Sequence, residues 1–481
     1  DYNGKYTIIL YVRRDKMNTK SRKGLLKTIV SLSLIFMVIL SYVVPAWAEE
    51  FVEVDQFLTP DISPWAQITL NEGERYGIYP ADWYYEGFRE EITEEKLETL
   101  LENTLNKIKA LELEENEDFI PVASKGDRTR EDVVIRLYNI LDQYNIADDS
   151  SPVDYMLKRN ILRGSYSGLN LDKICTTEEA VVFAIRLIED TYNLLDAGSK
   201  GFAWKVENNG NTVYLLGSIH VGNSHIYPIS NKLKEAFYES DALLVEADIL
   251  NMDSQLEAFM ELMIYQDGTT LKDHISEETY EKFLQVCEMH GIPSELFEGF
   301  KPWVIGITLE TFFATDLENI DEIAPSANYG IDLYFMSHAQ LIDMPIVELE
   351  GLEFQANLFD NLSEEAQDEY LNRVLDNLLN PEKNDYLTST EVLEEYLNLW
   401  KAGDIEGFAK SYLENDELLE DEFTSMLFGE RDKNMAAKII EILESEEKGT
   451  YFVVVGAGHF IVPNTIIYQL KDKGYEVEVF N

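Results

Sequence analysis

The sequence contains few cysteines, few histidines and few basic residues, and these shortages exclude several classes of protein. Two cysteines, Cys175 and Cys287, in 481 residues argue against a disulfide framework, so both are expected to be ordinary buried thiols. Lys and Arg number 39 against 90 Asp and Glu, a formal net charge of -51. Such a surface repels nucleic acid and favours solubility, divalent cations and cationic partners. Since 45% of the residues are hydrophobic, two or three folded domains are expected.

Motifs for the commonest hydrolytic sites are also missing. The sequence has neither Gly-x-Ser-x-Gly nor a paired Cys and His context, which argues against a Ser or Cys nucleophile. His-Glu-x-x-His is absent as well, so the protein is not an ordinary zincin.

Residues 1–48 are predicted to be a signal peptide with an upstream extension. From Met17 a basic segment precedes an apolar run over residues 28–44 and a small-x-small end at Ala48. That order is typical of a secretory signal peptide cleaved after Ala48. An uncleaved membrane anchor is the alternative, since about 17 apolar residues lie at the lower limit for spanning a bilayer. The protein is therefore expected to be exported, either extracellular or associated with the cell wall.

An all-α region is expected over residues 55–197. Two similar stretches place a Gly-containing loop before a helix that opens on a Thr followed by acids, at Thr93 and at Thr176, and a third helix starts near Asp127. The Thr hydroxyl caps free amides, and the acids compensate the helix dipole. This repetition resembles S-layer homology repeats, which would imply a cell-wall polysaccharide as a partner.

The Thr-Arg-x-Glu element of those repeats is only partly present. Arg130 keeps the arginine, while Glu94 and Thr177 stand at the equivalent positions. An acid cannot replace the bidentate grip of a guanidinium on an anion. The alternative is a helical domain that braces the rest of the chain.

An α/β (α+β) domain with a central mixed sheet covered by helices is expected over residues 200–481. Short apolar runs separated by helical stretches are typical of buried strands in such a sheet. The runs are residues 213–216, 242–245, 345–347 and 451–455, and an alternating edge strand is expected at 476–480.

Polar residues that can act as ligands follow these strands. Gly217-Ser218-Ile219-His220 follows one strand and Gly456-Ala457-Gly458-His459 another, and Glu246 and Glu350 follow two more. In α/β sheets ligands bind at the carboxyl ends of the strands. Two Gly-x-x-His motifs in a chain with only six histidines therefore predict one shared site.

These motifs, in this order, resemble the TraB/PrgY/GumN (Tiki-like) family from about Phe202 to the end of the chain. Ser218 stands where Thr is commoner and Gly351 where Thr is usual, so a hydroxyl near Glu350 is missing. The elements that carry the resemblance are residues 203–206, 217–222, 227–228, 240–248, 301–303, 330–332, 349–350, Gln355, Arg431, 434–435 and 455–459.

Two imidazoles and one or two carboxylates can hold Zn, Mn, Co or Fe and leave a position open for water. The resemblance implies a metal-dependent peptidase, which agrees with this composition. We hypothesise that His220, Glu246 and His459 bind the metal. Glu350 would be a fourth ligand or the general base, and Arg431 would stabilise an oxyanion or hold a substrate carboxylate.

Four further residues are assigned to substrate binding. His225 lies in the loop that leaves the first His motif, whereas Asp332, Gln355 and Asn434 are assigned through the resemblance alone. A helix N-cap is the alternative for Asp332. His274, His290 and His338 are expected to be surface or packing residues.

A peptide or protein is the expected substrate, and nucleic acid is not an expected partner. The alternative function is a non-catalytic peptide-binding or signal-sequestering protein at the cell surface. Two long acidic helical tracts, at about 251–340 and 363–447, would favour basic peptides if their charge lines the cleft.

Overall fold

The computed structural model describes residues 60–146, 150–251, 255–314, 327–380, 389–413 and 422–481. The predicted signal segment lies outside these ranges. No helix within them is both long and apolar enough to cross a membrane. Cys175 and Cys287 are buried free thiols, as predicted.

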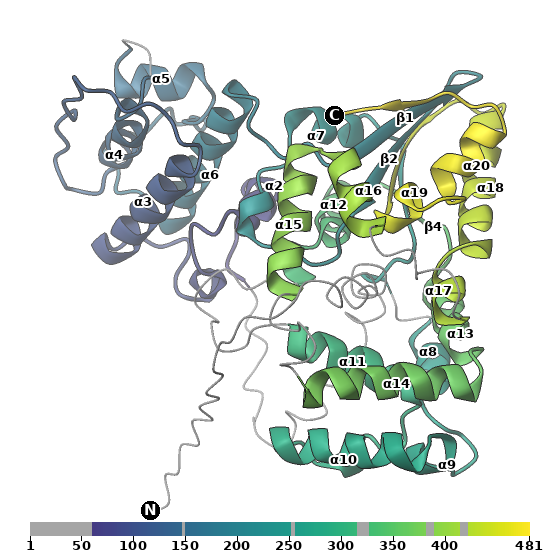
Figure 1. The fold of residues 1–481 in the computed structure, drawn as a ribbon. Coiled ribbons are helices and arrows are strands. Elements are labelled where there is room, and N and C mark those ends of the chain that lie inside the picture. The colour runs from purple at the N-terminus through teal and green to yellow at the C-terminus, as the bar shows by residue number, and fades with distance from the viewer. Residues whose placement is uncertain (1–59, 147–149, 252–254, 315–326, 381–388, 414–421) are drawn as a thin grey trace, which may run out of the picture.

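Residues 60–197 contain helices joined by loops and isolated β-bridges in the part that the structure describes. The three Thr-capped helix starts agree with the sequence pattern: the side chains of Thr93, Thr129 and Thr176 each accept a bond from an amide three residues later. Figure 1 shows these helices grouped beside residues 202–481, which contain the β-strands and are called the sheet domain below. Their bounds are α2 Gln67–Gly73, η1 Glu74–Tyr76, η2 Ala81–Tyr85, α3 Glu94–Lys109, α4 Arg130–Asp142, α5 Pro152–Lys158 and α6 Thr177–Leu194.

The guanidinium of Arg130 is bonded to other groups within residues 60–197, called the helical region below. Its guanidinium pairs with Glu179 and donates to the carbonyl oxygens of Leu169, at 2.9 Å, and Arg163, at 3.2 Å. Only 7% of the residue is exposed. The arginine of the partial Thr-Arg-x-Glu element is therefore bonded to groups of the protein itself, and attachment to the cell wall stays a prediction.

A six-stranded mixed sheet forms the centre of the second region, in the order β4-β3-β5-β2-β1-β6. Strands β4, β3, β5 and β2 are mutually parallel, and β1 runs antiparallel to β2 and β6. The predicted mixed sheet is thus confirmed. The strands are β1 Phe202–Asn208, β2 Asn211–Ser218, β3 Ala242–Val245, β4 Ile346–Glu348, β5 Thr450–Gly456 and β6 Val477–Val479.

Strand β1 was not among the predicted strands. It forms a two-residue hairpin with β2, in which Asn208 pairs with Asn211. Asn209 and Gly210 both have positive φ, 52° and 83°, which is the backbone of a type I′ turn. The Asn-Gly dipeptide between two apolar runs was the sequence signal that would have located this hairpin.

Aromatic side chains join helices to both faces of the sheet. Phe237 of α7 and Phe335 of α12 lie 5.7 and 4.9 Å from Phe452 of β5, ring centre to ring centre. On the opposite face, Phe408 of α16 lies 4.5 Å from Phe202 of β1. Successive strand residues point to opposite faces, and helices cover both faces of the central strands β3 and β5, whereas the edge strands β4 and β6 keep exposed residues. The bounds are α7 Asn231–Tyr238, α12 Ile331–Leu341 and α16 Ile405–Leu413.

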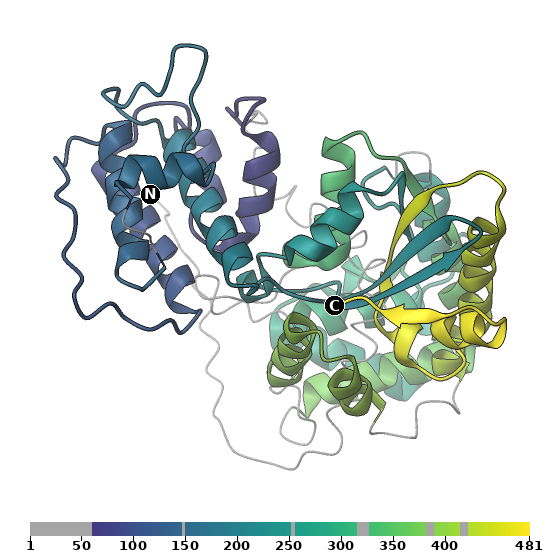
Figure 2. The same cartoon turned by 90° about the horizontal axis from the view of Figure 1, so that it is seen from above.

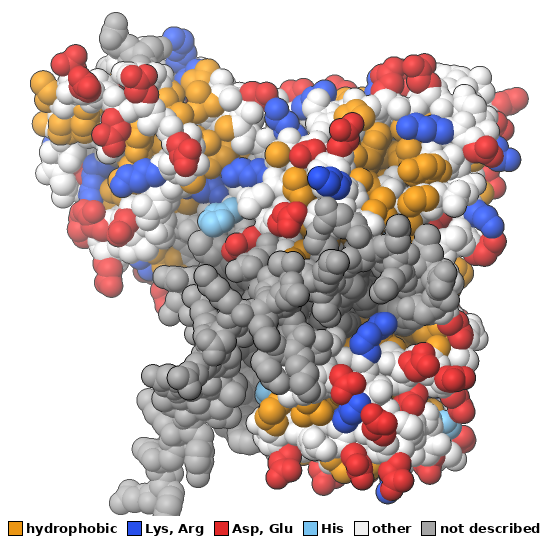
Figure 3. Space-filling model, viewed as in Figure 1, with side chains coloured by type: hydrophobic (Ala, Val, Ile, Leu, Met, Phe, Trp, Pro, Cys, Tyr) orange, Lys and Arg blue, Asp and Glu red, His pale blue; other side chains and the backbone are white. Residues whose placement is uncertain are grey.

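The remaining helices surround the sheet and extend below it in Figure 1. Figure 2 shows from above that helices α2–α6 stand to one side of the sheet domain. Acidic side chains are spread over the lower helical layer in Figure 3. The bounds are η3 Ser224–Ile226, α8 Leu256–Met263, α9 Leu271–His274, α10 Glu277–His290, η4 Ser294–Leu296, α11 Pro302–Ala314, η6 Ala327–Tyr329, α13 Leu352–Asp360, α14 Glu364–Leu379, α15 Ser389–Ala402, α17 Glu422–Leu427, α18 Glu430–Glu444, α19 Gly458–Ile461 and α20 Ile466–Asp472.

Candidate functional site

The candidate site lies where parallel strands end. Strands β2, β3, β4 and β5 share a direction, so the residues that follow them lie at one edge of the sheet. His220 comes two residues after β2, Glu246 directly after β3, Glu350 two residues after β4, and His459 three residues after β5. The predicted placement of these four residues after strand ends is therefore what the structure has.

His220 is fully buried and is oriented by a carboxylate. Its Nδ1 lies 2.5 Å from Asp332 Oδ2, and the hydroxyl of Ser218 donates to Asp332 Oδ1 at 2.8 Å. Burial disfavours the charged imidazole, but Asp332 outweighs burial, so the pKa of His220 is raised above its ordinary value. Nε2 has no hydrogen-bond partner among the described residues. A His whose Nδ1–H is held by a carboxylate presents Nε2 as a metal ligand or proton acceptor.

His459 repeats this arrangement from another part of the chain. Only 1% of the residue is exposed, and its Nδ1 lies 2.9 Å from Asp432 Oδ1 at the start of α18. The other oxygen of Asp432 accepts from the amide of Gly429 at 2.8 Å, which fixes the carboxylate. The Nε2 atom of His459 is also buried and unpartnered within the described residues. Sequence reasoning missed Asp432.

Arg431 links the two predicted carboxylates. Its guanidinium donates to Glu350 at 2.9 and 2.7 Å and to Glu246 Oε2 at 3.0 Å. Burial alone would raise the pKa of Glu350, but Arg431 lowers it below its ordinary value, so Glu350 is ionised. Burial likewise opposes charge on Arg431, but Glu350 outweighs it and the pKa of Arg431 is raised. The guanidinium of Arg431 therefore lies between two carboxylates of the site and is hydrogen-bonded to both.

Gln355 and the backbone of Gly456 complete the bonding of the carboxylates. Gln355 Nε2 donates to Glu246 Oε2 and to Glu350 Oε2, both at 3.1 Å. The amide of Gly456 donates to Glu246 Oε1 at 2.8 Å. Gln355, assigned to substrate binding from the resemblance, therefore bonds two site carboxylates in this structure.

Gly456 shows that the two histidines and Glu246 converge. A Cβ atom placed on Gly456 would lie 3.3 Å from both His220 Nε2 and Glu246 Oε1, and 3.7 Å from His459 Cδ2. One point in space is therefore close to all three side chains. Glycine leaves that point open.

Of the other predicted site residues, Asp332 lies at the candidate site, whereas His225 and Asn434 are exposed. Asp332 bonds Ser218 and His220 in the first turn of α12, while Gly330 holds the N-cap position, so the N-cap alternative for Asp332 is wrong. His225 is exposed on η3, and no hydrogen bond joins it to the described residues of the site. Asn434 is exposed on α18, one turn beyond Arg431. Of the remaining histidines, His338 is buried and lies 3.0 Å from Glu72 Oε2, which is a packing role.

Two of the three predicted metal ligands have a ring nitrogen that no described residue bonds. In both imidazoles Nε2 is buried and has no hydrogen-bond partner among the residues that the structure describes, and Nδ1 is bonded to a carboxylate, as is common among histidines that bind metals. Glu246 is instead bonded by Arg431, Gln355 and Gly456, and in the described residues no three His, Cys, Asp or Glu side chains form a group that could hold an ion. The donor chemistry fits a transition metal at the two histidines, whereas the carboxylate of Glu246 is bonded to protein donors in this structure, and the three-residue metal site stays a prediction.

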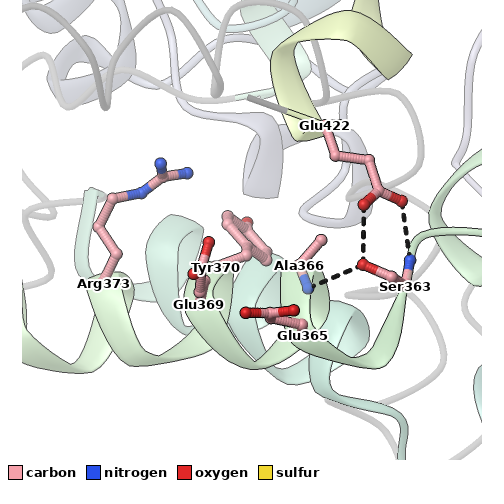
Figure 4. A pocket seen from close by; sticks show the side chains of 7 residues that line it. All are labelled: Ser363, Glu365, Ala366, Glu369, Tyr370, Arg373 and Glu422. Carbon is pink, nitrogen blue, oxygen red and sulfur yellow. Dashed lines mark hydrogen bonds between the residues drawn. The ribbon is translucent and has the colours of Figure 1, made fainter. Parts of the chain in front are cut away.

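A separate pocket of about 210 Å³ lies on α14, away from these residues (Figure 4). Ser363 there donates to Glu422 at 2.7 Å and accepts from the amide of Ala366 at 3.2 Å. Its lining contains none of the predicted site residues. The residues that line it are Ser363, Glu365, Ala366, Glu369, Tyr370, Arg373 and Glu422. The candidate site is therefore defined by its buried bonding network and not by this pocket.

The fold and this network together define an α/β protein with a paired-histidine site at the strand ends. The chain belongs to the TraB/PrgY/gumN family, whose model matches residues 202–479. The resemblance predicted from the motifs is thereby confirmed for this region.

Three similar proteins illustrate the range of relatives. The uncharacterized protein YbaP of Escherichia coli K12 is 27% identical over 260 residues, which cover 54% of this chain and 87% of YbaP. The metalloprotease TIKI2 of Xenopus tropicalis is 22% identical over 320 residues, 58% of this chain and 59% of TIKI2. The metalloprotease TIKI1 of Danio rerio is 21% identical over 319 residues, 58% and 62% of the two chains. No solved structure matches.

Proposed function

We propose that this protein is an exported metal-dependent peptidase. The observation that carries the proposal is the pair of buried imidazoles, His220 and His459, which lie beside Glu246; each is bonded to a carboxylate at Nδ1 and has no Nε2 partner in the described part of the chain. Two relatives named as metalloproteases support the same class of reaction. Peptides or proteins are the corresponding substrates.

His220 and His459 would bind the metal through Nε2, and Glu246 would become the third ligand by exchanging a hydrogen bond to Arg431, Gln355 or Gly456 for the metal. Bound there, a transition metal lowers the pKa of a water molecule and polarises a carbonyl group. Asp332 and Asp432 keep the imidazoles oriented.

The remaining site residues carry protons and charge. Glu350, which Arg431 keeps ionised, can accept a proton from the attacking water. Arg431 can stabilise negative charge that develops on the substrate oxygen or bind a substrate carboxylate. Gln355 restrains both carboxylates.

Removal of the metal tests the proposed function. Protein treated with a chelator should no longer cleave a mixed peptide library, because the histidines alone supply no activated water. Zn, Mn, Co and Fe should then be added separately to find which of them restores cleavage. Mass spectrometry of the library and elemental analysis of the protein are the two measurements. The proposal is contradicted if protein purified both aerobically and anaerobically contains no bound metal and shows no metal-dependent cleavage. Intact peptides retained by the protein would indicate the binding-only alternative.

Substitution of Gly456 tests the convergence of the ligands. Gly456→Ala places a methyl group 3.3 Å from His220 Nε2 and Glu246 Oε1. We expect kcat/KM to fall about 10²-fold, since displacements near 1 Å cost that much at a reacting centre. Gly299→Ala is the matched control, because a Cβ on Gly299 meets no atom of the described residues within 4 Å. Equal activity of the two variants would refute a shared site at Gly456.

A further inference from the structure

Helix α2 and η1 of the helical region pack against α12 of the sheet domain. Asn71 Nδ2 lies 3.1 Å from His338 Nδ1 on α12. Arg75 Nε donates to the carbonyl oxygen of Asn328, just before α12, at 3.0 Å. The Arg75 guanidinium also lies 5.5 Å from the centre of the Tyr334 ring. The two regions therefore meet through specific polar contacts along one helix.

Glu72 is the centre of this contact. Only 4% of the residue is exposed, and its carboxylate accepts from Tyr334 at 2.5 Å, from Lys234 of α7 at 3.1 Å and from Tyr76 at 3.0 Å. His338 Nε2 lies 3.0 Å from the same carboxylate. Burial alone would raise the pKa of Glu72, but Lys234 and His338 lower it well below its ordinary value. Glu72 is thus a buried, ionised group bonded to two helices of the sheet domain.

The amino-terminal turn of α12 carries the carboxylate that orients His220. Asp332 Oδ2 lies 2.5 Å from His220 Nδ1, and the amide of Ile331 donates to the carbonyl oxygen of Ile219 at 3.1 Å. A Cβ on Gly330 would lie only 2.3 Å from the carbonyl oxygen of His220, so the turn is in close contact with the His loop. Because Asp332 lies on α12, a shift of this helix that the His220 loop does not follow changes the position of Asp332 relative to His220.

Tyr334 and His338 are four residues apart and share one side of α12, whereas Asp332 lies two residues before Tyr334 on another side. The helix is bonded to Glu72 on the first side and to the His220 loop on the second. We propose that Glu72 is a positioning residue, which acts on His220 through α12 and Asp332. Its effect on turnover rests on the proposed function, but its effect on the orientation of His220 does not.

Nuclear magnetic resonance of the full chain with ¹⁵N-labelled histidine tests this role. In Glu72→Gln, the Nδ1–H signal of His220 should shift or broaden, because the hydrogen bond to Asp332 is no longer held in one geometry. The Nδ1–H signal of His459 should stay in place, because Asp432 belongs to α18. His220→Gln and His459→Gln assign the two signals. Amides of α12 should exchange with solvent roughly tenfold faster or more, as expected when a hydrogen bond to a charged group is lost.

Asp190→Asn is the matched control. It removes a carboxylate that pairs with Arg159 inside the helical region, and among the described residues no bond joins that carboxylate to α12. If Glu72→Gln fails to fold, Tyr334→Phe removes one donor to Glu72 and should produce a smaller change of the same kind. An unchanged His220 signal in folded Glu72→Gln, or the same change in Asp190→Asn, overturns the positioning role. If the His220 signal shifts in Glu72→Gln but the wild-type protein cleaves no peptide, the positioning role of Glu72 is supported and the proposed function is contradicted.

Discussion

His459→Ala should lower kcat/KM by on the order of 10³-fold or more, because loss of one imidazole ligand removes metal activation of water, an effect of several kcal/mol. Steady-state cleavage of a peptide identified from the library is the measurement. Folding of the variant should be checked by thermal unfolding, since the side chain is 1% exposed and its removal leaves a cavity.

Two further variants make the His459 result specific. His274→Ala is the matched control, because His274 lies in α9 and bonds Thr269 and Glu364. Asp432→Asn keeps the imidazole but weakens its orientation, so a loss of about 10- to 100-fold is expected. Under the binding-only alternative His459→Ala retains part of the peptide affinity. Wild-type turnover in a folded His459→Ala protein would remove His459 from the mechanism.

Arg431→Met should lower the free energy of unfolding by about 3–5 kcal/mol, because it leaves buried carboxylates without their counter-charge. The Arg431 side chain is 4% exposed and those of Glu246 and Glu350 are each 1% exposed. Urea denaturation at neutral pH is the measurement. Arg89→Met is the control: Arg89 pairs with Asp61 at the surface, with 55% and 57% of the side chains exposed, so a loss below about 1 kcal/mol is expected.

The loss in Arg431→Met should depend on pH. The folded-state pKa of Glu350 is lowered, so the ionised carboxylate stabilises the wild-type protein above the unfolded-state pKa of 4.5, and this stability is lost as the pH falls through the folded-state pKa. The difference between wild type and variant should therefore narrow on acidification. A difference that stays constant as the pH falls below 4.5 and through the folded-state pKa of Glu350 contradicts the role assigned to the Arg431–Glu350 pair.

Local patterns in the sequence were enough to predict much of the fold. The apolar runs that became β2, β3 and β5 are bounded by polar or Gly-containing segments, and the Thr-acid starts became helix caps. His220, Glu246 and His459 could be placed because each follows such a strand. These features depend on residues close together in the chain, which is why one sequence reveals them.

The partners of those residues could not be predicted in the same way. Asp332 and Asp432 are two of 90 acidic residues, and their selection as histidine partners depends on how α12 and α18 pack. The contact of Glu72 with Tyr334 joins residues 262 positions apart. No local periodicity encodes such pairs. The resemblance did mark Asp332 and Gln355, but it assigned them to substrate, whereas both bond protein groups here.

The strand order has a consequence for when the site exists during synthesis. Strand β5 lies between β2 and β3, although it follows them by more than two hundred residues in the chain. Until residues 450–456 have been added, β2 and β3 lack the strand that joins them, and Glu246 lacks the Gly456 amide. A growing polypeptide therefore carries His220 and Glu246 without a neighbouring His459. Because this closure needs segments that are distant in the chain, we expect it to be a slow step of folding, and the candidate site is complete only after β5 and His459 have been synthesised.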